Sequence, residues 1–479
     1  MLLNKKTLFL LKKLRIMKYT FKTILFTTLA FFLLTTIVAQ EKFMLPEYTK
    51  VQLKNGLTVY LMEQHEVPLI QLIGVFPGGA IFDKKDKSGL ANSTATALAL
   101  GSKNYTKAQI EQNVEFLGAS LSTGASLEYA YISSSFMKKD QKEILAIVKD
   151  VLLNPIFPKD ELDKMMSRRL VEMDQRKESP RAVLGDYYSK FVFGDHPYGN
   201  PENGIKSNLE AITKEDIVTF YKEMYDPKTS AIAVVGDFDT KSMKKEIESL
   251  FGKWNSEGSP AINLSEVPKN NESRVLVVNK DNATETTFYI GGPGIARNNP
   301  DYVGVEVINT ILGGRFTSWL NDELRVNSGL TYGARSSFSH YKLGGSFIIS
   351  TFTANETTEQ TIDLALETYG RLHKKGLDQE TLLSAKNYVK GQFPPNYETN
   401  ATLANLLTDM YIYNFDESYI NTFNTQVDEL TVDKANILIE KYFPKDHLQF
   451  VLIGKASEIG EMAKKYGEVK LVEITADGF

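Results

Sequence analysis

The sequence predicts an α+β protein made of two similar halves. Segments with alternating apolar residues, typical of strands, are interspersed with segments whose apolar residues recur at helical spacing. A threonine-capped helix followed by a buried strand occurs twice with equal spacing, from Thr213 to Gly236 and from Thr431 to Gly454. Duplication explains this repeat better than coincidence, although threonine-capped helices before strands are common. Residues 256–272 are polar and poor in apolar side chains, which suits a linker between two domains at 45–255 and 273–479.

The first domain begins with strands and continues with helices. Residues 51–61 alternate around Asn55-Gly56, a pair favoured in tight hairpins, and residues 69–76 form another strand that ends at Pro77-Gly78-Gly79. Apolar residues at helical spacing then predict helices at 88–100, 106–117, 140–153 and 158–177. Thr106 is the expected N-cap of the second of these helices.

The second domain contains the stretch 313–333, which starts with Gly313-Gly314 and therefore allows a tight turn or a close backbone approach. Phe316, Trp319, Leu320 and Leu324 follow at the spacing of one helical face. The pattern predicts a helix that ends near Arg325 and a strand that opens with Leu330-Thr331-Tyr332, so that Arg325 and Tyr332 could converge. On general grounds alone, Arg325 would be a solvated cation and Tyr332 a core aromatic residue.

Residues 1–39 have the pattern of a signal peptide. Lys18 and Lys22 precede the apolar run 24–39, and Val38-Ala39 offers a cleavage point. The run is short and rich in threonine compared with a membrane span of about 20 residues, so we predict cleavage rather than an uncleaved anchor. Met17 is an alternative start. If the source is a bacterium with two membranes, we expect the mature protein in the periplasm. We expect no membrane span after cleavage, and the protein could still associate with a membrane complex.

Composition excludes several classes of function. A net charge of −4 gives no basic footprint for nucleic acid. The absence of cysteine excludes disulfides, a thiol nucleophile and a cysteine-based zinc site. No two of the five histidines have the spacing of metal ligands on a helix, and no G-x-S-x-G motif of a serine hydrolase is present. We therefore expect no metal and no other cofactor in this chain.

Several short motifs stand out along residues 45–479: Pro77-Gly78-Gly79, Ser88-Gly89-Leu90-Ala91, His196-Pro197-Tyr198-Gly199, Val235-Gly236-Asp237-Phe238-Asp239 and the stretch 313–333. Together they resemble the pitrilysin/insulinase metallopeptidases, also called inverzincins. The resemblance implies two homologous α+β domains in a clam-shell arrangement, each with a mainly antiparallel sheet and helices on one face. It also implies that Arg325 and Tyr332 form the pair that polarises the substrate.

The family's zinc motif is missing. In the family, H-x-x-E-H follows Gly-Leu-Ala on a helix, with two histidine ligands and a glutamate that activates water. The matching positions here are Asn92, Ala95 and Thr96. A further glutamate ligand of the family matches Glu172, which we expect to be a vestigial or surface residue. One carboxylate cannot hold catalytic zinc, which usually needs three protein ligands.

Two classes of function follow from the resemblance. In some bacterial members of the family the active form is a heterodimer, in which one chain carries zinc and the other carries the Arg/Tyr pair. This chain resembles the second kind, which implies that it is inactive alone and donates Arg325 and Tyr332 to peptide bound at the zinc of a partner. The alternative is a catalytically inactive peptide-binding or scaffold subunit of a cell-envelope complex. A self-sufficient protease of unfamiliar chemistry is the least favoured hypothesis.

Overall fold

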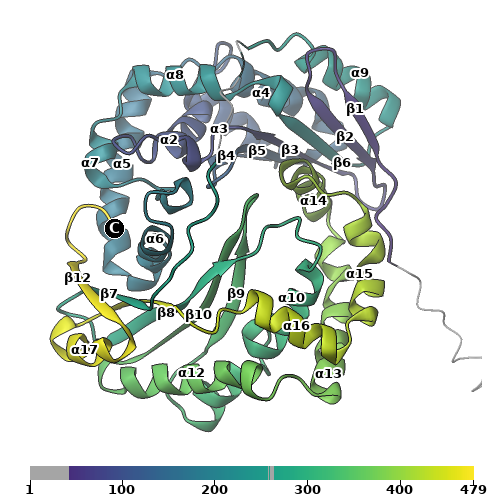
Figure 1. Cartoon of the computed structure of the whole chain (residues 1–479). Coiled ribbons are helices and arrows are strands. Elements are labelled where there is room, and N and C mark those ends of the chain that lie inside the picture. Colours follow the sequence, from purple (N-terminus) through teal and green to yellow (C-terminus); the bar gives the residue numbers. More distant parts are fainter. Residues whose placement is uncertain (1–42, 257, 259–263) are drawn as a thin grey trace, which may run out of the picture. The chain divides into compact units, whose positions relative to one another are not determined.

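Two six-stranded sheets organise the described residues, 43–256, 258 and 264–479, of the computed structural model (Figure 1). The predicted signal peptide, residues 1–39, lies outside these residues. The first sheet has the order β1-β2-β6-β3-β5-β4, with β1 Thr49–Gln52, β2 Thr58–Glu63, β3 Leu69–Phe76, β4 Ser120–Ala125, β5 Ala130–Met137 and β6 Ala231–Gly236. The second has the order β12-β7-β11-β8-β10-β9, with β7 Arg274–Asn279, β8 Glu285–Gly294, β9 Arg335–His340, β10 Gly345–Ala354, β11 Gln449–Gly454 and β12 Glu468–Glu473.

Five strands follow the same order in both sheets, since β2-β6-β3-β5-β4 corresponds to β7-β11-β8-β10-β9. In each sheet the first pair of this series is parallel and the next three pairs are antiparallel. The remaining edge differs, because β1 is antiparallel to β2 whereas β12 is parallel to β7. The prediction of a duplicated, mainly antiparallel α+β fold is confirmed.

The repeated sequence unit forms the same structure in both halves. Thr213 caps α8 (Lys214–Met224), which leads to β6, and Thr431 caps α16 (Val432–Tyr442), which leads to β11. Each threonine hydroxyl accepts a hydrogen bond at 3.1 Å from the backbone N–H three residues later. The repeat therefore reflects a shared helix and strand rather than coincidence.

The first sheet is covered on one face by helices of its own half. These helices are α2 Leu90–Ala97, α3 Lys107–Phe116, α4 Gln141–Leu153, α8 and α9 Thr240–Phe251. Ile144 and Ile147 of α4 and Ile247 of α9 pack into one apolar core with Leu72 and Val234 of the sheet. Such a layer is what an amphipathic helix over a half-buried strand pattern produces.

The other face of each sheet receives a helix from the opposite half, and we call α6 (Pro180–Phe193) and α14 (Asn400–Tyr413) the exchanged helices. α6 packs on β8 and β11, and α14 packs on β3 and β6 (Figure 1). The Tyr188 hydroxyl on α6 donates to the Phe347 carbonyl of β10 at 3.0 Å. With both faces covered, β6 and β11 are buried along their whole length. Residues 45–479 form one compact unit.

The remaining α-helices are α5 Lys159–Glu178, α7 Lys206–Glu210, α10 Tyr302–Asn309, α11 Trp319–Asn321, α12 Thr358–Lys374, α13 Gln379–Gln392, α15 Ser418–Glu429 and α17 Ala456–Ala463. In the predicted linker, residues 264–272 contain neither helix nor strand, and the domain boundaries at 45–255 and 273–479 stay a prediction. Among the described residues, no helix combines the length and the apolar character needed to cross a membrane.

Candidate functional site

A close backbone contact begins the stretch that carries Arg325 and Tyr332. The π-helical turn η6 (Thr310–Gly314) continues α10 and lies against β9. A Cβ atom at Gly313 would lie 2.1 Å from the Ser336 nitrogen, so a larger residue does not fit without moving the strand. Ser336 Oγ donates to Asn309 Oδ1 at 2.6 Å, and Asn309 Nδ2 donates to the Ser336 carbonyl at 3.2 Å. These bonds hold the close approach that the paired glycines predict.

The helix that carries Arg325 differs from the predicted one. It starts at Trp319 as α11 (Trp319–Asn321) and continues as the π-helix η7 (Asp322–Asn327). Its inward side chains are buried as predicted, at Leu320 and Leu324. Phe316 lies in a turn before the helix and is 66% exposed, so its predicted place on the buried face is wrong.

Tyr332 lies in a loop, because β9 starts only at Arg335 and not at Leu330 as predicted. The hydroxyls of Thr351 and Thr353 on β10 donate to backbone carbonyls on either side of Tyr332, at 3.0 and 2.7 Å. These side-chain bonds take the place of strand pairing in this segment. The Tyr332 side chain is 83% exposed, which excludes the interpretation as a core aromatic residue.

Arg325 and Tyr332 are both exposed, and neither forms a hydrogen bond or an ion pair with any residue that the structure describes. The Arg325 guanidinium lies 4.9 Å from the centroid of the Phe316 ring. The Tyr332 ring lies 6.5 Å from the Phe352 ring, at an interplanar angle of 22°. Both side chains are thus supported by aromatic rings, while their N–H and O–H donors remain available to a ligand.

The positions that match the zinc motif do come together. Asn92 and Thr96 on α2 and Glu172 on α5 line one pocket of about 330 Å³. Ala95, at the position of the general base, is fully buried. The donors are therefore an amide, a hydroxyl and one carboxylate, and this set does not fit catalytic zinc. No group of three or more histidines and acidic residues suited to a metal occurs within the described ranges.

An arginine that sequence reasoning missed is bound to the first of these positions. Arg169 Nη1 donates to Asn92 Oδ1 at 2.6 Å, and its Nη2 donates to the Asn203 carbonyl at 3.2 Å. Burial lowers the pKa of Arg169, while the nearby charges of Glu172 and Asp83 act in the opposite direction. Arginine stays protonated in proteins. A cation bonded at the position of a zinc ligand repels a divalent metal, which adds to the poor donor set.

Asp83 supports the N-terminal end of the same helix, α2. Its carboxylate accepts hydrogen bonds from the backbone N–H groups of Gly89 at 2.7 Å and of Ala91 at 2.8 Å. These bonds satisfy free donors at the start of α2, which has no side-chain cap of its own. Burial raises the pKa of Asp83 to about 7, although the backbone bonds act in the opposite direction.

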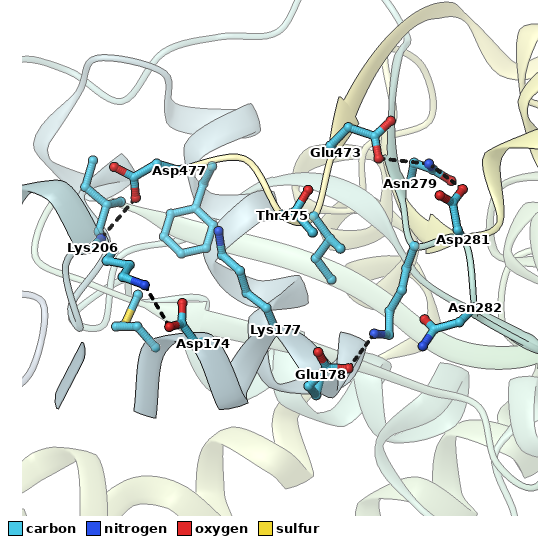
Figure 2. A pocket seen from close by; sticks show the side chains of 16 residues that line it. Asp174, Lys177, Glu178, Lys206, Asn279, Asp281, Asn282, Glu473, Thr475 and Asp477 are labelled. Atoms are coloured by element: carbon cyan, nitrogen blue, oxygen red, sulfur yellow. Dashed lines mark hydrogen bonds and ion pairs between the residues drawn. The ribbon is translucent and has the colours of Figure 1, made fainter. Parts of the chain in front are cut away.

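A second pocket, of about 520 Å³, lies along the end of α5, and residues 473–479 form part of its wall (Figure 2). Two of its three lysines form ion pairs, Lys280–Glu178 at 2.8 Å and Lys206–Asp174 at 2.7 Å, while Lys177 donates to the Ala476 carbonyl. The Asp477 carboxylate accepts the backbone N–H groups of Lys206 and Ser207, each at 3.1 Å. Most charges of this pocket therefore satisfy one another, and Lys177 is its one lysine without an ion pair among the described residues.

Two matches to known families cover most of the chain. Residues 64–204 match the family described as "Insulinase (Peptidase family M16)", and residues 211–389 match "Peptidase M16 inactive domain". The second match contains both Arg325 and Tyr332, and the first contains Asn92, Thr96 and Glu172. The resemblance based on short motifs is therefore confirmed for both halves.

Individual relatives agree with this assignment. The "Non-peptidase homolog YmxG" of Helicobacter pylori is 24% identical over 400 residues, which cover 82% of this chain and 90% of the relative. The "Zinc protease PqqE" of the same organism is 25% identical over 417 residues, which cover 83% and 91%. A solved structure described as a peptidase M16 inactive domain from Pseudomonas fluorescens has a TM-score of 0.80 and 26% identity, and covers 85% of this chain and 98% of that one. The chain thus belongs to the peptidase M16, or insulinase, family.

Proposed function

We propose that this chain is the non-metal-binding subunit of a heterodimeric zinc metallopeptidase, to which it contributes Arg325 and Tyr332. One observation carries the proposal: Arg325 and Tyr332 are exposed and form no hydrogen bond with any described residue, while Asn92, at a metal-ligand position of the first half, is bonded to Arg169. The chain has no ligand set for zinc among its described residues. Any hydrolytic role for the two donors therefore requires a metal held by another molecule.

The two side chains suit a carbonyl oxygen that gains negative charge during peptide hydrolysis. The guanidinium of Arg325 supplies N–H donors and the phenol of Tyr332 supplies one O–H donor. The backbone around Tyr332 is fixed by Thr351 and Thr353, so the exposed tyrosine is presented by an ordered loop. Donors fixed before the reaction stabilise the transition state without reorganisation, and losing one such donor typically costs about a hundred- to a thousandfold in turnover.

The kind of partner is suggested by the relatives. Helicobacter pylori has one relative named a non-peptidase homologue and another named a zinc protease, and this chain is similar to both over most of its length. A genome that encodes both kinds of chain can supply both halves of a composite site. We therefore expect the source genome to encode a secreted family member with an intact H-x-x-E-H motif.

The experiment mixes this chain with that family member and measures peptide cleavage by each protein alone and by the mixture. We expect activity in the mixture only, and less than stoichiometric zinc in this chain. Tyr332→Phe and Arg325→Ala should lower kcat of the mixture by about a hundred- to a thousandfold without dissociating the complex. Tyr388→Phe and Arg335→Ala are matched controls, since Tyr388 is 41% exposed and Arg335 is exposed on β9. Both should leave kcat unchanged.

Full activity with the double variant Arg325→Ala/Tyr332→Phe would contradict the donor role. A complex that forms but contains no zinc-bearing chain would instead support the second candidate, a peptide-binding or scaffold subunit of a cell-envelope complex. That candidate is favoured by the same loss of metal ligands at Asn92 and Thr96, which removes catalysis but not the ability to bind a chain.

The site of action that fits this proposal is the periplasm or the outer surface of the cell. The support is the basic and apolar pattern of residues 18–39, which is typical of a cleaved signal peptide. N-terminal sequencing of the protein isolated from the cell envelope should find Gln40 as the first residue. A start before residue 24 would show that the segment is retained.

A further inference from the structure

The guanidinium of Arg169 is a largely buried charge whose hydrogen bonds do not include an anion. Its two bonds go to neutral oxygens, the Asn92 side chain at 2.6 Å and the Asn203 carbonyl at 3.2 Å. Its Nε is buried and has no hydrogen-bond partner among the described residues. Buried charges are normally hydrogen-bonded to an opposite charge, because an uncompensated charge in a low-dielectric interior is costly. The site around Arg169 therefore lacks one anionic group.

The two nearby carboxylates do not fill this role. Asp83 has its oxygens bonded to the backbone N–H groups of Gly89 and Ala91, at 2.7 and 2.8 Å. Glu172 lies on the same helix as Arg169, one turn further on, and its side chain is exposed. Neither carboxylate forms an ion pair with Arg169 in the described part of the chain. Both contribute at longer range only, since their charges raise the pKa of Arg169 against the effect of burial.

The lining of the pocket has an excess of positive charge. Three arginines line it, Arg168, Arg169 and Arg176, with Glu172 as the acidic residue of the lining. Arg176 is already paired with Asp186 at 2.8 Å. Arg168 is exposed and forms no hydrogen bond or ion pair with any described residue. Two guanidinium groups, that of Arg168 exposed and that of Arg169 partly buried, thus face the pocket without a bonded carboxylate.

We propose that this pocket, at the former metal position, binds a carboxylate group of a peptide, with Arg168 and Arg169 as its charge partners. Arginine is suited to this task because its planar N–H groups match the two oxygens of a carboxylate. A volume of about 330 Å³ is at the small end of ligand sites. It suits a chain end or one acidic side chain rather than a folded segment.

The proposal concerns this chain alone and needs neither a partner nor Arg325 and Tyr332. A zinc ion at this position would bind a neutral carbonyl oxygen or a water molecule. An arginine at the same position binds an anion instead. In the neighbouring 520 Å³ pocket, two of the three lysines, Lys206 and Lys280, already have a carboxylate partner. Among the described residues, an anion would find two guanidinium groups without a bonded carboxylate in the smaller pocket, and one lysine, Lys177, without an ion pair in the larger one.

The proposal is tested by measuring how tightly the purified full chain binds three labelled hexapeptides made of alanine, glycine and serine. Fluorescence anisotropy gives the affinity for each peptide. The first peptide has a free C-terminal carboxylate, the second is amidated, and the third is amidated but contains one central glutamate. We expect the first or the third to bind about ten- to a hundredfold more tightly than the second, as charge-assisted hydrogen bonds contribute. Which of the two binds identifies the carboxylate as a chain end or a side chain. Equal binding of all three peptides would overturn the proposal.

Three variants assign the binding to the pocket. Arg168→Gln should lower the affinity for the carboxylate-bearing peptide about tenfold. Because Arg168 is exposed, this variant keeps the fold. Arg169→Gln should have the larger effect, and its folding is checked by thermal unfolding. Glu172→Gln should tighten binding, since it removes the negative charge of the lining. Arg335→Gln, exposed on β9, is the control and should bind as the original chain does.

If Arg169→Gln does not fold, the pair Arg168→Gln and Glu172→Gln still decides the question. Opposite changes in affinity support the pocket, and unchanged affinity in both variants overturns it. The selective binding should also weaken as salt is raised, because exposed charges such as Arg168 are screened. Failure of this test leaves the heterodimer proposal untouched, since no peptidase partner is present in the assay.

Discussion

The two halves of the protein share five strands in one order but treat their site regions in opposite ways. In the first half, the pocket between α2 and α5 contains a hydrogen bond from Arg169 to Asn92, so that the position of a metal ligand is already engaged. In the second half, Arg325 and Tyr332 are exposed without a partner among the described residues. The first half thus presents an arginine at a former metal position, whereas the second half presents two exposed donors that no described residue engages.

The edges of the two sheets differ as well. The first sheet ends with β1, which comes from the chain just before β2, whereas the second ends with β12, which comes after all other strands. The shared part is thus the five-strand core with its parallel first pair, and the edge strands are separate additions. Edge strands are tolerant of such change because only one side of each is paired.

The largest effect we expect comes from weakening an exchanged helix. Tyr188 is buried on α6 and its ring packs edge-on against Tyr289 of the second sheet. Tyr188→Ala should lower the free energy of unfolding by about 3–5 kcal/mol, as for other large aromatic truncations. Tyr188→Phe removes only the hydrogen bond to Phe347 and should cost about 1 kcal/mol. Urea unfolding measures both values.

A matched truncation in the other exchanged helix sharpens this comparison. Leu407 is fully buried on α14, and Leu407→Ala should cost about 2–5 kcal/mol. Comparable losses in both variants would mean that each half depends on the helix it receives. A loss below about 1 kcal/mol for Tyr188→Ala would show that α6 contributes little to holding the second sheet.

A smaller difference is expected between the two repeated helix caps. Thr213 forms a reciprocal capping box with Asp216, whose carboxylate accepts the Thr213 backbone N–H at 2.8 Å. Thr431 accepts from the Lys434 backbone but has no returning side-chain bond. Thr213→Ala should therefore cost about 1–2 kcal/mol and Thr431→Ala about 0.5–1 kcal/mol. Thermal unfolding of the two variants compares them, and equal costs would show that the returning bond contributes nothing.

The smallest expected effect is a dependence on pH that only the first cap has. Burial alone would raise the pKa of Asp216, but its bonds to Lys87 and Thr213 outweigh burial and hold the pKa below its ordinary value. A lowered folded-state pKa means that the stabilisation is complete above about pH 4, the ordinary pKa of aspartate, and is lost as the pH falls below it. The stability difference between the original chain and Asp216→Asn should shrink in that range.

The matched position in the second half is the control for this pH dependence. Lys434 takes the place of Asp216 there, so this cap contains no carboxylate. The stability difference between the original chain and Lys434→Gln should therefore stay constant as the pH is lowered to 3. A parallel change in both pairs would mean that the effect is a general response to acid and not a property of the cap.

Local patterns in the sequence were sufficient for much of this fold. The threonine caps, the equal spacing of the repeat and the hairpin around Asn55-Gly56 depend on residues close together in the chain, and the structure has all three. The matched zinc-motif positions Asn92, Thr96 and Glu172 also come together as the resemblance implied. These features need no knowledge of which segments meet across the molecule.

The errors and omissions have non-local causes. No local pattern within α6 or α14 says that each helix covers the sheet of the other half. Leu330-Thr331-Tyr332 has the residues of a strand, yet hydroxyls of β10 bind its backbone from outside the segment. In the sequence, Arg169 is one of many charged residues on α5, and nothing in its immediate neighbours distinguishes it from a solvated side chain. Its spacing one turn before Glu172 was the available signal that it faces the same pocket.

The exchanged helices also determine when each sheet can be covered during synthesis of the chain. α14 is synthesised long after β3 and β6, so a growing or emerging chain holds a complete first sheet whose second face is still apolar and uncovered. Such a face promotes association between chains until residues 400–413 arrive. A translation stop between residues 255 and 400 should therefore yield aggregates rather than a soluble first half.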